Sequence, residues 1–397
     1  MPGYTYLIVG GGMTAASAIG GIREVDPAGT IGVIGADANP PYDRPPLSKG
    51  LWKDKPLESI WRKIDGEGVT FHLGRTARQL DWQAKRVTDD QGTAYSYTKL
   101  LLATGCTPRR LPFGEDRIIY YRTVDDYRRL RSQTEAGDHF AVIGSGFIGS
   151  ELAAALAING RKVTLIFPDE AIGSRMYPAE LANSLNDYYR EKGVALRTRS
   201  KVTGCEARGG QSVVKILDSN TQRESEVIVD GVIAGIGVQP NVEMAQAAEL
   251  TVDNGIRVDS SLRISKPDIY AAGDVASFHN PALNQWLRVE HEDNANTMGK
   301  AAGNSMAGQA VSYEHLPFFY SDLFDMGYEA VGEVDSRLEM VAEWKAPLKE
   351  GVVYYLREGR VRGVLLWNVF GQVEFARQLI ASIGPFTPAD LKGRLPA

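Results

Sequence analysis

The stretch FAVIGSGFIGSELAAALAING, residues 140–160, decides the fold of this chain. Its first four residues are predicted to form a buried strand, and its alanine-rich second half is predicted to form a helix. Between them, Gly144, Gly146 and Gly149 fit the pattern GxGxxG of a dinucleotide-binding turn. The first Gly makes the tight turn, the second lets the backbone approach a pyrophosphate, and the third lets helix and strand pack closely. The amides at the start of the helix then face the phosphates.

The same pattern occurs near the N-terminus. A buried strand is predicted at residues 4–9, GGGMTA follows at 10–15, and a helix of small residues comes next. A single match is a weak signal, because tight glycine turns also occur for structural reasons. Two matches, each between a strand and a helix, predict an α/β fold with two Rossmann-like domains that bind two dinucleotides.

An acidic residue is expected after the second strand of each unit, where it accepts a hydrogen bond from a ribose 2′-OH. In the later unit the strand spans 162–167 and Asp169 follows it. Its carboxylate would repel a 2′-phosphate, which favours NADH over NADPH, although Arg175 nearby softens the preference. In the earlier unit the strand spans 30–34 and the acid is Asp37. Standing alone, either acid would be interpreted as a surface loop residue.

Three more short apolar strands end in glycine-containing turns, at residues 100–103, 227–234 and 269–272. The first two are typical of strands that close a dinucleotide domain, with a glycine turn passing close to the ligand. The third is followed by Asp274, whose carboxylate is well placed to hydrogen-bond a sugar or ribityl hydroxyl. A helix N-cap is the structural alternative for this residue.

The pattern changes after residue 311. Segments 352–356 and 361–367 predict a β-hairpin, with an earlier strand at 341–344 and a helix at about 374–382. These elements predict a third, mixed α+β unit in which no chemistry-bearing motif stands out.

Composition limits the function. The net charge of −5 argues against a nucleic-acid partner, which needs a concentrated basic face. Cys106 and Cys205 lie too far apart for a CxxC motif and indicate a reducing cytoplasm. The sequence has no run of about 18 apolar residues, so no membrane span is predicted. The start of the chain also lacks the basic region of a signal peptide.

Six motifs together resemble one family: GGGMTAA, PYDRPPLSK, LLLATGCTPR, VIGSGFIGSELA, AGIGVQPNVE and IYAAGDVA. They are similar to motifs of the two-dinucleotide flavoprotein reductases of the glutathione-reductase fold, over essentially the whole chain. Within that family the chain looks like the ferredoxin and rubredoxin reductases and apoptosis-inducing factor. The segments 318–335 and 363–370 resemble apoptosis-inducing factor, so the chain looks like a compact prokaryotic relative of that protein.

The resemblance implies three domains. These are a discontinuous FAD-binding domain (1–110 and 242–312), an NAD(H)-binding domain (111–241) and a C-terminal α+β domain (313–397). It implies an oxidoreductase that accepts hydride from NADH, in preference to NADPH, onto FAD and passes electrons on. The acceptor is left open among ferredoxin, rubredoxin, a quinone and dioxygen, and a homodimer is one possible state. Hydride transfer needs no protein acid or base, only stacking, orientation and charge.

The resemblance places PYDRPPLSK, residues 41–49, beside the flavin ring. Disulfide reductases of this fold carry a redox cysteine pair here, whereas this chain has Pro45, Pro46 and Leu47. No thiol is available for disulfide exchange, so a disulfide reductase is not expected. The prolines stiffen a loop that holds Lys49 as a fixed cation, which stabilises a ring that becomes anionic on reduction. The resemblance pairs Lys49 with Glu151, whose structural alternative is a glutamate favoured by the helix dipole.

Other candidates follow from the resemblance. Phe147 covers the flavin face and moves when nicotinamide stacks, or else is an ordinary core residue. His291, after Glu290, lies near flavin and nicotinamide, although a lone His is usually structural. Tyr320 stands where the apoptosis-inducing factor pattern has Trp. Ala36 stands where the family has its ribose acid, one residue before Asp37.

The remaining candidates share a match to the family's cofactor-binding positions. They are Gly10, Gly12, Met13, Thr14, Ala15, Arg44, Ala77, Thr104, Gly105, Arg122, Ser145, Ile148, Gly237, Glu329 and Asn368. No metal site is expected. An acidic iron–sulfur partner would prefer a basic rim, for which Arg44, Arg109 and Arg110 are candidates.

Two classes of function stay open. One is a turnover enzyme that reduces an electron acceptor. The other is a redox sensor, in which a long-lived complex of reduced flavin and NAD⁺ changes oligomerisation or partner binding. A relative that has lost its flavin is a third interpretation, and the intact glycine motifs speak against it.

Overall fold

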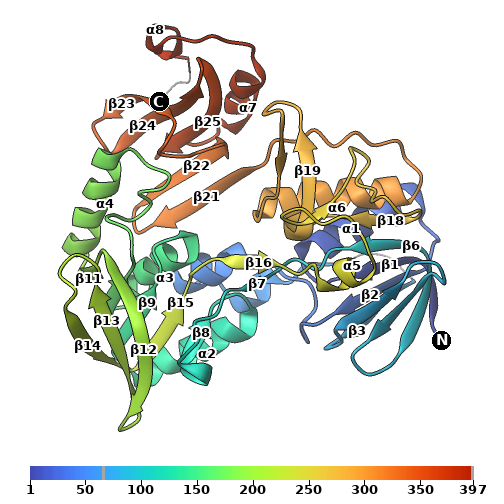
Figure 1. Ribbon diagram of the computed structural model, residues 1–397, viewed down its shortest axis with the longest axis horizontal. Helices are drawn as coiled ribbons and strands as arrows, with labels where there is room; N and C mark the ends of the chain where they lie inside the picture. Colours follow the sequence, from blue (N-terminus) through green and yellow to red (C-terminus); the bar gives the residue numbers. More distant parts are fainter. Residues whose placement is uncertain (65–67, 395–397) are drawn as a thin grey trace. The chain divides into compact units, whose positions relative to one another are not determined.

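The computed structural model describes residues 1–64 and 68–394. The chain forms two compact units (Figure 1). Unit 1 comprises Met1–Asp43, Glu58–Thr107 and Gln239–Phe318. Unit 2 comprises Arg44–Leu57, Pro108–Val238 and Phe319–Ala397. The chain crosses between the units at residues 43/44, 57/58, 107/108, 238/239 and 318/319. The crossings at 107/108 and 238/239 lie in two paired strands, β7 (Cys106–Pro108) and β16 (Val238–Pro240).

Unit 1 is built on a sheet in the order β3-β2-β1-β6-β5-β4, with β18 also paired to β6. Its parallel strands are β1 (Gly3–Val9), β2 (Ile31–Gly35), β3 (Val69–Leu73), β6 (Ala94–Leu102) and β18 (Ile269–Ala271). The antiparallel edge is β4 (Ala77–Asp81) and β5 (Arg86–Asp89). The parallel strands predicted from apolar runs are confirmed, because strands covered on both faces are apolar throughout.

Helices α1 (Met13–Val25) and α6 (Glu292–Met306) lie side by side in unit 1 (Figure 1). Small residues make this possible. A Cβ on Gly299 would lie 2.5 Å from the carbonyl oxygen of Thr14, and one on Gly303 would lie 2.2 Å from that of Ala18. The close packing holds the start of α1, which carries the first glycine motif, against the middle of α6.

Smaller elements complete unit 1. They are η3 (Leu57–Ile60), α5 (Glu243–Ala247), η5 (Gly273–Val275) and a three-stranded sheet of β17 (Ile256–Arg257), β19 (Ala276–Asn280) and β20 (Gln285–Leu287).

Unit 2 contains a second parallel sheet in the order β11-β10-β9-β15-β8. Its strands are β8 (Ile118–Tyr120), β9 (His139–Ile143), β10 (Lys162–Ile166), β11 (Val194–Arg197) and β15 (Gly231–Ala234). Its helices are α2 (Val124–Ala136), α3 (Phe147–Ile158) and α4 (Ala179–Glu191), and its short turns are η1 (Pro45–Ser48), η2 (Gly50–Trp52) and η4 (Glu115–Arg117). The strand and helix predicted around the second glycine motif are confirmed as β9 and α3.

The prediction of a single strand at 227–234 is wrong, because its two halves belong to different sheets. The first half lies in β14 (Glu224–Val229), which belongs to a sheet in the order β12 (Ser200–Arg208), β13 (Gln211–Asp218), β14. The second half is β15, which belongs to the parallel sheet. Asp230 makes the break, because its Oδ2 accepts hydrogen bonds from the backbone N–H groups of Asp138 at 2.8 Å and His139 at 2.9 Å. The backbone hydrogen bond from His139 leads the causes that lower the pKa of Asp230.

The C-terminal part of unit 2 is an antiparallel sheet in the order β21-β22-β25-β24-β23. Its strands are β21 (Phe318–Leu323), β22 (Met326–Gly332), β23 (Glu339–Ala346), β24 (Glu350–Arg357) and β25 (Arg360–Trp367), followed by α7 (Val373–Ala381) and α8 (Pro388–Leu391). The predicted hairpin, the strand at 341–344 and the late helix are confirmed. Within the described part of the chain, no helix is long and apolar enough to cross a membrane.

Candidate functional site

The first glycine turn lies at the end of β1 in unit 1. Gly10 has φ +120°, and a Cβ there would lie 1.9 Å from the carbonyl oxygen of Ala103, so only glycine fits. Gly12 is the N-cap of α1, and no described side chain caps the helix there. Met13 to Ala15 form its first turn, with Thr14 and Ala15 buried. The first amides of α1 are thus left for a phosphate, as a pyrophosphate-binding turn requires.

Predicted residues from distant segments meet at this turn. Gly10 packs on the backbone of Ala103 and Thr104, and a Cβ on Gly273 would lie 2.2 Å from Oγ1 of Thr14. Thr104 is fixed by Asn241, which it meets through two hydrogen bonds of 2.8 Å each. The backbone N–H of Asn241 also donates to the carbonyl of Gly105 at 3.0 Å. The sequence did not predict this role for Asn241, because an asparagine after a strand has no distinctive pattern.

Asp274 lies inside the one-turn helix η5, whose cap position is Ala272, so the N-cap alternative for this residue is wrong. The carbonyl oxygen of Asp274 accepts a hydrogen bond from Arg288 at 3.2 Å. Arg288 also forms an ion pair with Glu290 at 2.6 Å, and His291 is the N-cap of α6. Arg288 therefore links the predicted residues Asp274 and Glu290, and the sequence reading missed it.

Asp37 stands two residues beyond β2 and closes its own loop. Its Oδ1 accepts from the amide and side chain of Asn39 at 2.9 and 2.8 Å, and its Oδ2 accepts from the Tyr42 hydroxyl at 2.9 Å. A carboxylate offers about four lone-pair sites, so Oδ2 retains capacity for a ribose hydroxyl. Ala77 begins β4, three residues after Gly74, whose N–H donates to the backbone carbonyl of Asp37 at 3.2 Å.

Another residue absent from the sequence predictions is Arg62. Its guanidinium donates to Asp43 at 2.6 Å and to the carbonyl oxygen of Met13 and Oγ of Ser17, both at 3.3 Å. It thereby ties the segment before PPLSK to the first turns of α1 within unit 1.

The second glycine turn repeats the first within unit 2. Gly144 has φ +97°, and a Cβ there would lie 2.4 Å from the carbonyl oxygen of Gly235. A Cβ on Gly149 would lie 1.8 Å from the carbonyl oxygen of Gly144, so α3 can pack on the turn only with glycine at this position. A Cβ on Gly146 would meet nothing within 4 Å. This open space at the uncapped start of α3 fits a pyrophosphate group.

Ser145 lies in this turn, and Ile148 in the first turn of α3. Phe147, the first residue of α3, is half-buried and makes an edge contact with Phe319 at 5.4 Å between ring centroids. It is therefore not a fully enclosed core side chain.

Asp169 follows β10 as predicted and pairs with Arg175. The guanidinium reaches Oδ1 at 3.1 and 3.3 Å, while Arg175 itself is 79% exposed. Such an exposed pair adds little to stability. It keeps a carboxylate and an exposed cation together where the adenosine ribose is expected.

The predicted pair of Lys49 and Glu151 forms, with Nζ 2.7 Å from Oε2. The side chains are 12% and 2% exposed. Glu151 also accepts hydrogen bonds from Ser48 and Ser321. Lys49 Nζ lies 5.2 Å from the ring centroid of Tyr320, a cation–π distance. The ammonium has three N–H donors, so the pair leaves it donors for a ligand.

The other predicted positions of unit 2 have structural partners. Asn368 has φ +51° and is bonded at both ends of its amide, accepting from Gly327 N–H and donating to Lys349 carbonyl at 2.7 Å each. Glu329 accepts from the amide of Gly371 at 3.1 Å. The carbonyl of Gly237 accepts a hydrogen bond from the N–H of Arg109. Two further predicted positions precede helices: Arg122 lies just before α2, and Arg44 lies just before η1.

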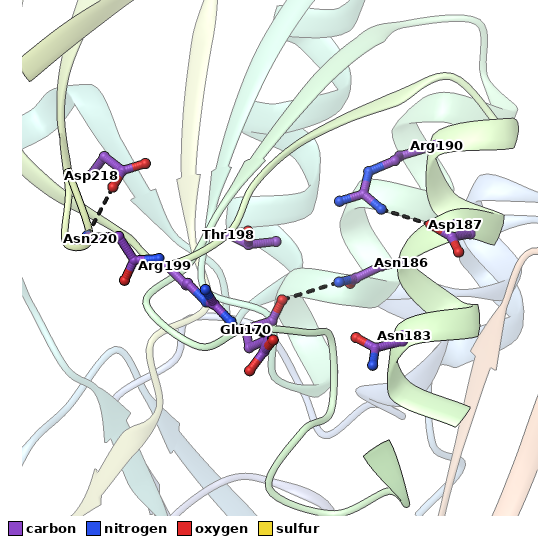
Figure 2. Close-up of a pocket in the computed structure, with 9 residues that line it drawn as sticks. All are labelled: Glu170, Asn183, Asn186, Asp187, Arg190, Thr198, Arg199, Asp218 and Asn220. Carbon is purple, nitrogen blue, oxygen red and sulfur yellow. Dashed lines mark hydrogen bonds and ion pairs between the residues drawn. The ribbon is translucent and has the colours of Figure 1, made fainter. Parts of the chain in front are cut away.

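A surface pocket of about 450 Å³ lies elsewhere in unit 2, between α4 and the turns after β10, β11 and β13 (Figure 2). None of the predicted site residues lines it. Four of its charged groups form two pairs, Arg190 with Asp187 at 2.8 Å and Arg199 with Glu170. The remaining one, Asp218, accepts hydrogen bonds from the backbone N–H groups of Asn220 and Thr221 at 2.9 and 2.8 Å. We assign this pocket no role.

Two glycine turns, each at an uncapped helix start, define a protein that binds two dinucleotides. Among the described residues no group of His, Cys, Asp and Glu could hold a metal ion. The two cysteines are free, and neither lies in the PYDRPPLSK segment. The residues present thus fit FAD and NAD(P)H.

The chain belongs to the family described as pyridine nucleotide-disulphide oxidoreductase, which matches residues 4–299. The family described as apoptosis-inducing factor, mitochondrion-associated, C-term matches residues 302–350 and 344–382. The resemblance stated from the motifs is confirmed, and the chain is an FAD-dependent NAD(P)H oxidoreductase.

Three relatives illustrate the range of the family. The ferredoxin–NAD(+) reductase component of the anthranilate 1,2-dioxygenase system of Burkholderia cepacia is 33% identical, over 95% of this chain and 94% of the relative. Apoptosis-inducing factor 1 of Dictyostelium discoideum is 32% identical, over 95% of this chain and 78% of the relative. The putidaredoxin reductase in its covalent complex with putidaredoxin superposes with a TM-score of 0.87 at 29% identity, over 95% and 92% of the two chains.

Proposed function

We propose that this protein takes hydride from NADH onto FAD and delivers electrons to a ferredoxin-type iron–sulfur protein. The observation that carries the proposal is the buried pair of Lys49 and Glu151, beside a proline-stiffened turn with no cysteine. A fixed cation suits direct electron delivery, whereas the disulfide reductases of this fold need a thiol at this place. The names of two relatives, a ferredoxin–NAD(+) reductase component and a putidaredoxin reductase, support the acceptor.

We assign FAD to unit 1. The turn from Gly10 to Ala15 would hold its pyrophosphate, Asp274 its ribityl chain and Asp37 its ribose, with Thr104 and Gly105 lining the approach. FAD, when bound, supplies the chemistry of hydride acceptance and electron release. The protein binds FAD, orients it and places charged groups around it. The three-domain division at residues 110, 241 and 312 belongs to this proposal.

We assign NADH to the glycine turn of unit 2. Gly144, Gly146 and the start of α3 would hold the pyrophosphate. The carboxylate of Asp169 would accept hydrogen bonds from the adenosine ribose and repel a 2′-phosphate. Arg175 reduces that discrimination, because its guanidinium can turn from Asp169 toward a phosphate. NADH is therefore the preferred donor, with NADPH used more weakly.

The role proposed for Lys49 is electrostatic. Its ammonium, held by Glu151, would face the flavin ring and stabilise negative charge there. Phe147 would cover the ring until nicotinamide displaces it. Glu290 and His291 of unit 1 are further candidates for contact with the FAD assigned to that unit. Arg109 and Arg110 are exposed and would contribute a basic rim for an acidic partner. With only two distant thiols in the chain, a reducing cytoplasm is the proposed location.

A redox sensor is the second candidate, and the match of residues 302–382 to the apoptosis-inducing factor C-terminal family favours it. In that case the complex of reduced protein and NAD⁺ persists, and its formation changes the oligomeric state of the protein or its binding to a partner.

One experiment separates the two candidates. The purified yellow protein receives one equivalent of NADH without oxygen, and then either air or a plant-type or putidaredoxin-type ferredoxin. Rapid bleaching followed by rapid return of the oxidised spectrum with ferredoxin supports the reductase. A broad long-wavelength band that persists in air, with an NADH-dependent change in sedimentation, supports the sensor. A protein that neither contains nor takes up FAD contradicts both.

A further inference from the structure

The carboxylate of Glu151 receives more than the ammonium of Lys49. Its Oε2 accepts a hydrogen bond from the Ser48 hydroxyl at 2.5 Å, and its Oε1 accepts one from the Ser321 hydroxyl at 2.6 Å. Glu151, Ser48 and Ser321 are 2%, 4% and 1% exposed, respectively. Both carboxylate oxygens are therefore satisfied by the protein in a place closed to water, through hydrogen bonds that the negative charge strengthens.

Rigid elements supply these two hydroxyls. Ser48 ends η1, whose Leu47 carbonyl accepts hydrogen bonds from the Trp52 indole at 2.8 Å and the Tyr121 hydroxyl at 2.6 Å. Ser321 lies in the middle of β21, in the C-terminal sheet. The cluster thus joins the proline-stiffened turn, helix α3 and the C-terminal sheet within unit 2.

Two neutral donors solve an electrostatic problem. A buried carboxylate with an unsatisfied oxygen favours its protonated form, and a protonated Glu151 would release Lys49. An extra cation would satisfy the oxygen but would also draw the carboxylate away from Lys49. Hydroxyls satisfy it without adding charge, so the ammonium of Lys49 remains the cation that the carboxylate holds.

The tyrosines around Glu151 add no charge to the cluster, and Tyr328 also hydrogen-bonds the side chain of Ser321. Tyr177, Tyr189 and Tyr328 face Glu151, and burial raises the pKa of each phenol well above its ordinary value, so they stay neutral. Lys53 and Asp322 line the small cavity next to Lys49 and Glu151. Lys53 donates instead to the carbonyl oxygen of Phe324 at 3.4 Å.

We propose that Ser48 and Ser321 are positioning residues that hold the Glu151 carboxylate with its Oε2 directed at Lys49. Through that pair they fix the charge that acts on the flavin, so this inference rests on the proposed function. It also gives the C-terminal sheet a direct part in the redox site, through one hydroxyl of β21.

The test compares FAD-loaded wild type with Ser321→Ala and Ser321→Thr. In Ser321→Ala the rate of flavin reduction by NADH should fall about tenfold at neutral pH. The acid limb of its pH profile should move up by about one unit, the size expected for losing one hydrogen bond to a charged group. The FAD reduction potential should become more negative. Ser321→Thr keeps the hydroxyl and should restore all three.

A matched control is Ser200→Ala, also in unit 2. Ser200 is 4% exposed and its hydroxyl donates to the carbonyl oxygen of Thr198 at 2.9 Å. This variant should lose stability without changing the pH profile or the potential. In a Glu151→Gln background, Ser321→Ala should change the rate less than about twofold, because the residue through which the serine acts is already gone.

An infrared measurement needs no FAD and decides the inference separately. In Ser321→Ala the protonated-carboxyl band should appear at a pH about one unit higher than in wild type, and Ser321→Ala/Glu151→Gln should lack this shifted band. Ser48→Ala serves as the second variant if Ser321→Ala does not fold. A wild-type pH profile and an unshifted carboxyl band, with only the stability loss of the control, would overturn the inference. Failure of wild type to be reduced by NADH would instead contradict the proposed function.

Discussion

The first two glycines of the second turn permit an experiment that separates folding from coenzyme binding. Gly144 and Gly146 stand two residues apart, yet their surroundings differ. A methyl group on Gly144 would lie 2.4 Å from a carbonyl oxygen at φ +97°, whereas one on Gly146 would meet no protein atom within 4 Å. Gly146 has φ −74°, which any residue adopts.

The expected magnitudes follow from this geometry. Gly144→Ala should lose at least about 3 kcal/mol of unfolding free energy, since backbone strain costs about 1–3 kcal/mol and the overlap adds to it. Gly146→Ala should lose about 0.5–1 kcal/mol, because alanine is a poor N-cap. Its methyl group would, however, occupy the space assigned to the NADH pyrophosphate. A loss of about 2 kcal/mol there weakens NADH binding about 30-fold.

Urea unfolding gives the stability of both variants, and the NADH dependence of the flavin reduction rate gives the dissociation constant. FAD content is the internal control and should not change in Gly146→Ala, because FAD is assigned to the other glycine turn. If Gly146→Ala binds NADH as wild type does, the pyrophosphate does not pass this glycine, and the assignment of unit 2 to NADH is refuted.

Three further predictions follow from single side chains. Asp169→Ala should raise the ratio of kcat/KM for NADPH to kcat/KM for NADH about 10- to 100-fold, because it removes the repulsion of a 2′-phosphate and releases Arg175. Adding Arg175→Ala should cancel much of this gain in steady-state assays. Lys49→Met should slow anaerobic flavin reduction by NADH about 10- to 1,000-fold and make the FAD potential more negative, and an unchanged potential would contradict the charge role. Asp230→Asn should lower the urea midpoint at pH 7. Because the pKa of Asp230 is lowered in the folded state, its carboxylate stabilises the fold above the unfolded-state pKa, and the two curves should converge as the pH falls below about 4; a constant difference down to pH 2 would refute this.

The glycine turns could be predicted because their constraints are local. The Gly144 motif needs a left-handed residue, an open residue and a packing glycine at fixed spacing, and the structure has all three at 144, 146 and 149. Apolar runs likewise gave strands where the chain is buried on both sides. The pattern failed at Asp230, because a single acid inside a β-rich run does not reveal that its carboxylate bonds the chain at residues 138 and 139.

The partners of the site residues could not be predicted for the opposite reason. Arg62, Arg288 and Ser321 act through contacts with residues 49, 14 and 170 positions away, respectively. Arginine and serine are common on surfaces, so neither type carries a signal without the fold. Asp37 shows the same limit, since the sequence located the acid but not Tyr42 and Asn39, which occupy part of its carboxylate.

The orientation of a charge pair matters more than its presence. Lys49 and Glu151 together carry no net charge, so at a distance their fields largely cancel. Their effect on a bound ring therefore depends on which end faces it and on how firmly that end is held. A motif search finds the two residues, but the direction of the pair is set by Ser48 and Ser321, which hold the carboxylate from both sides. We expect a chain that kept Lys49 and Glu151 but lost both hydroxyls to keep the two charges and yet have a different flavin potential.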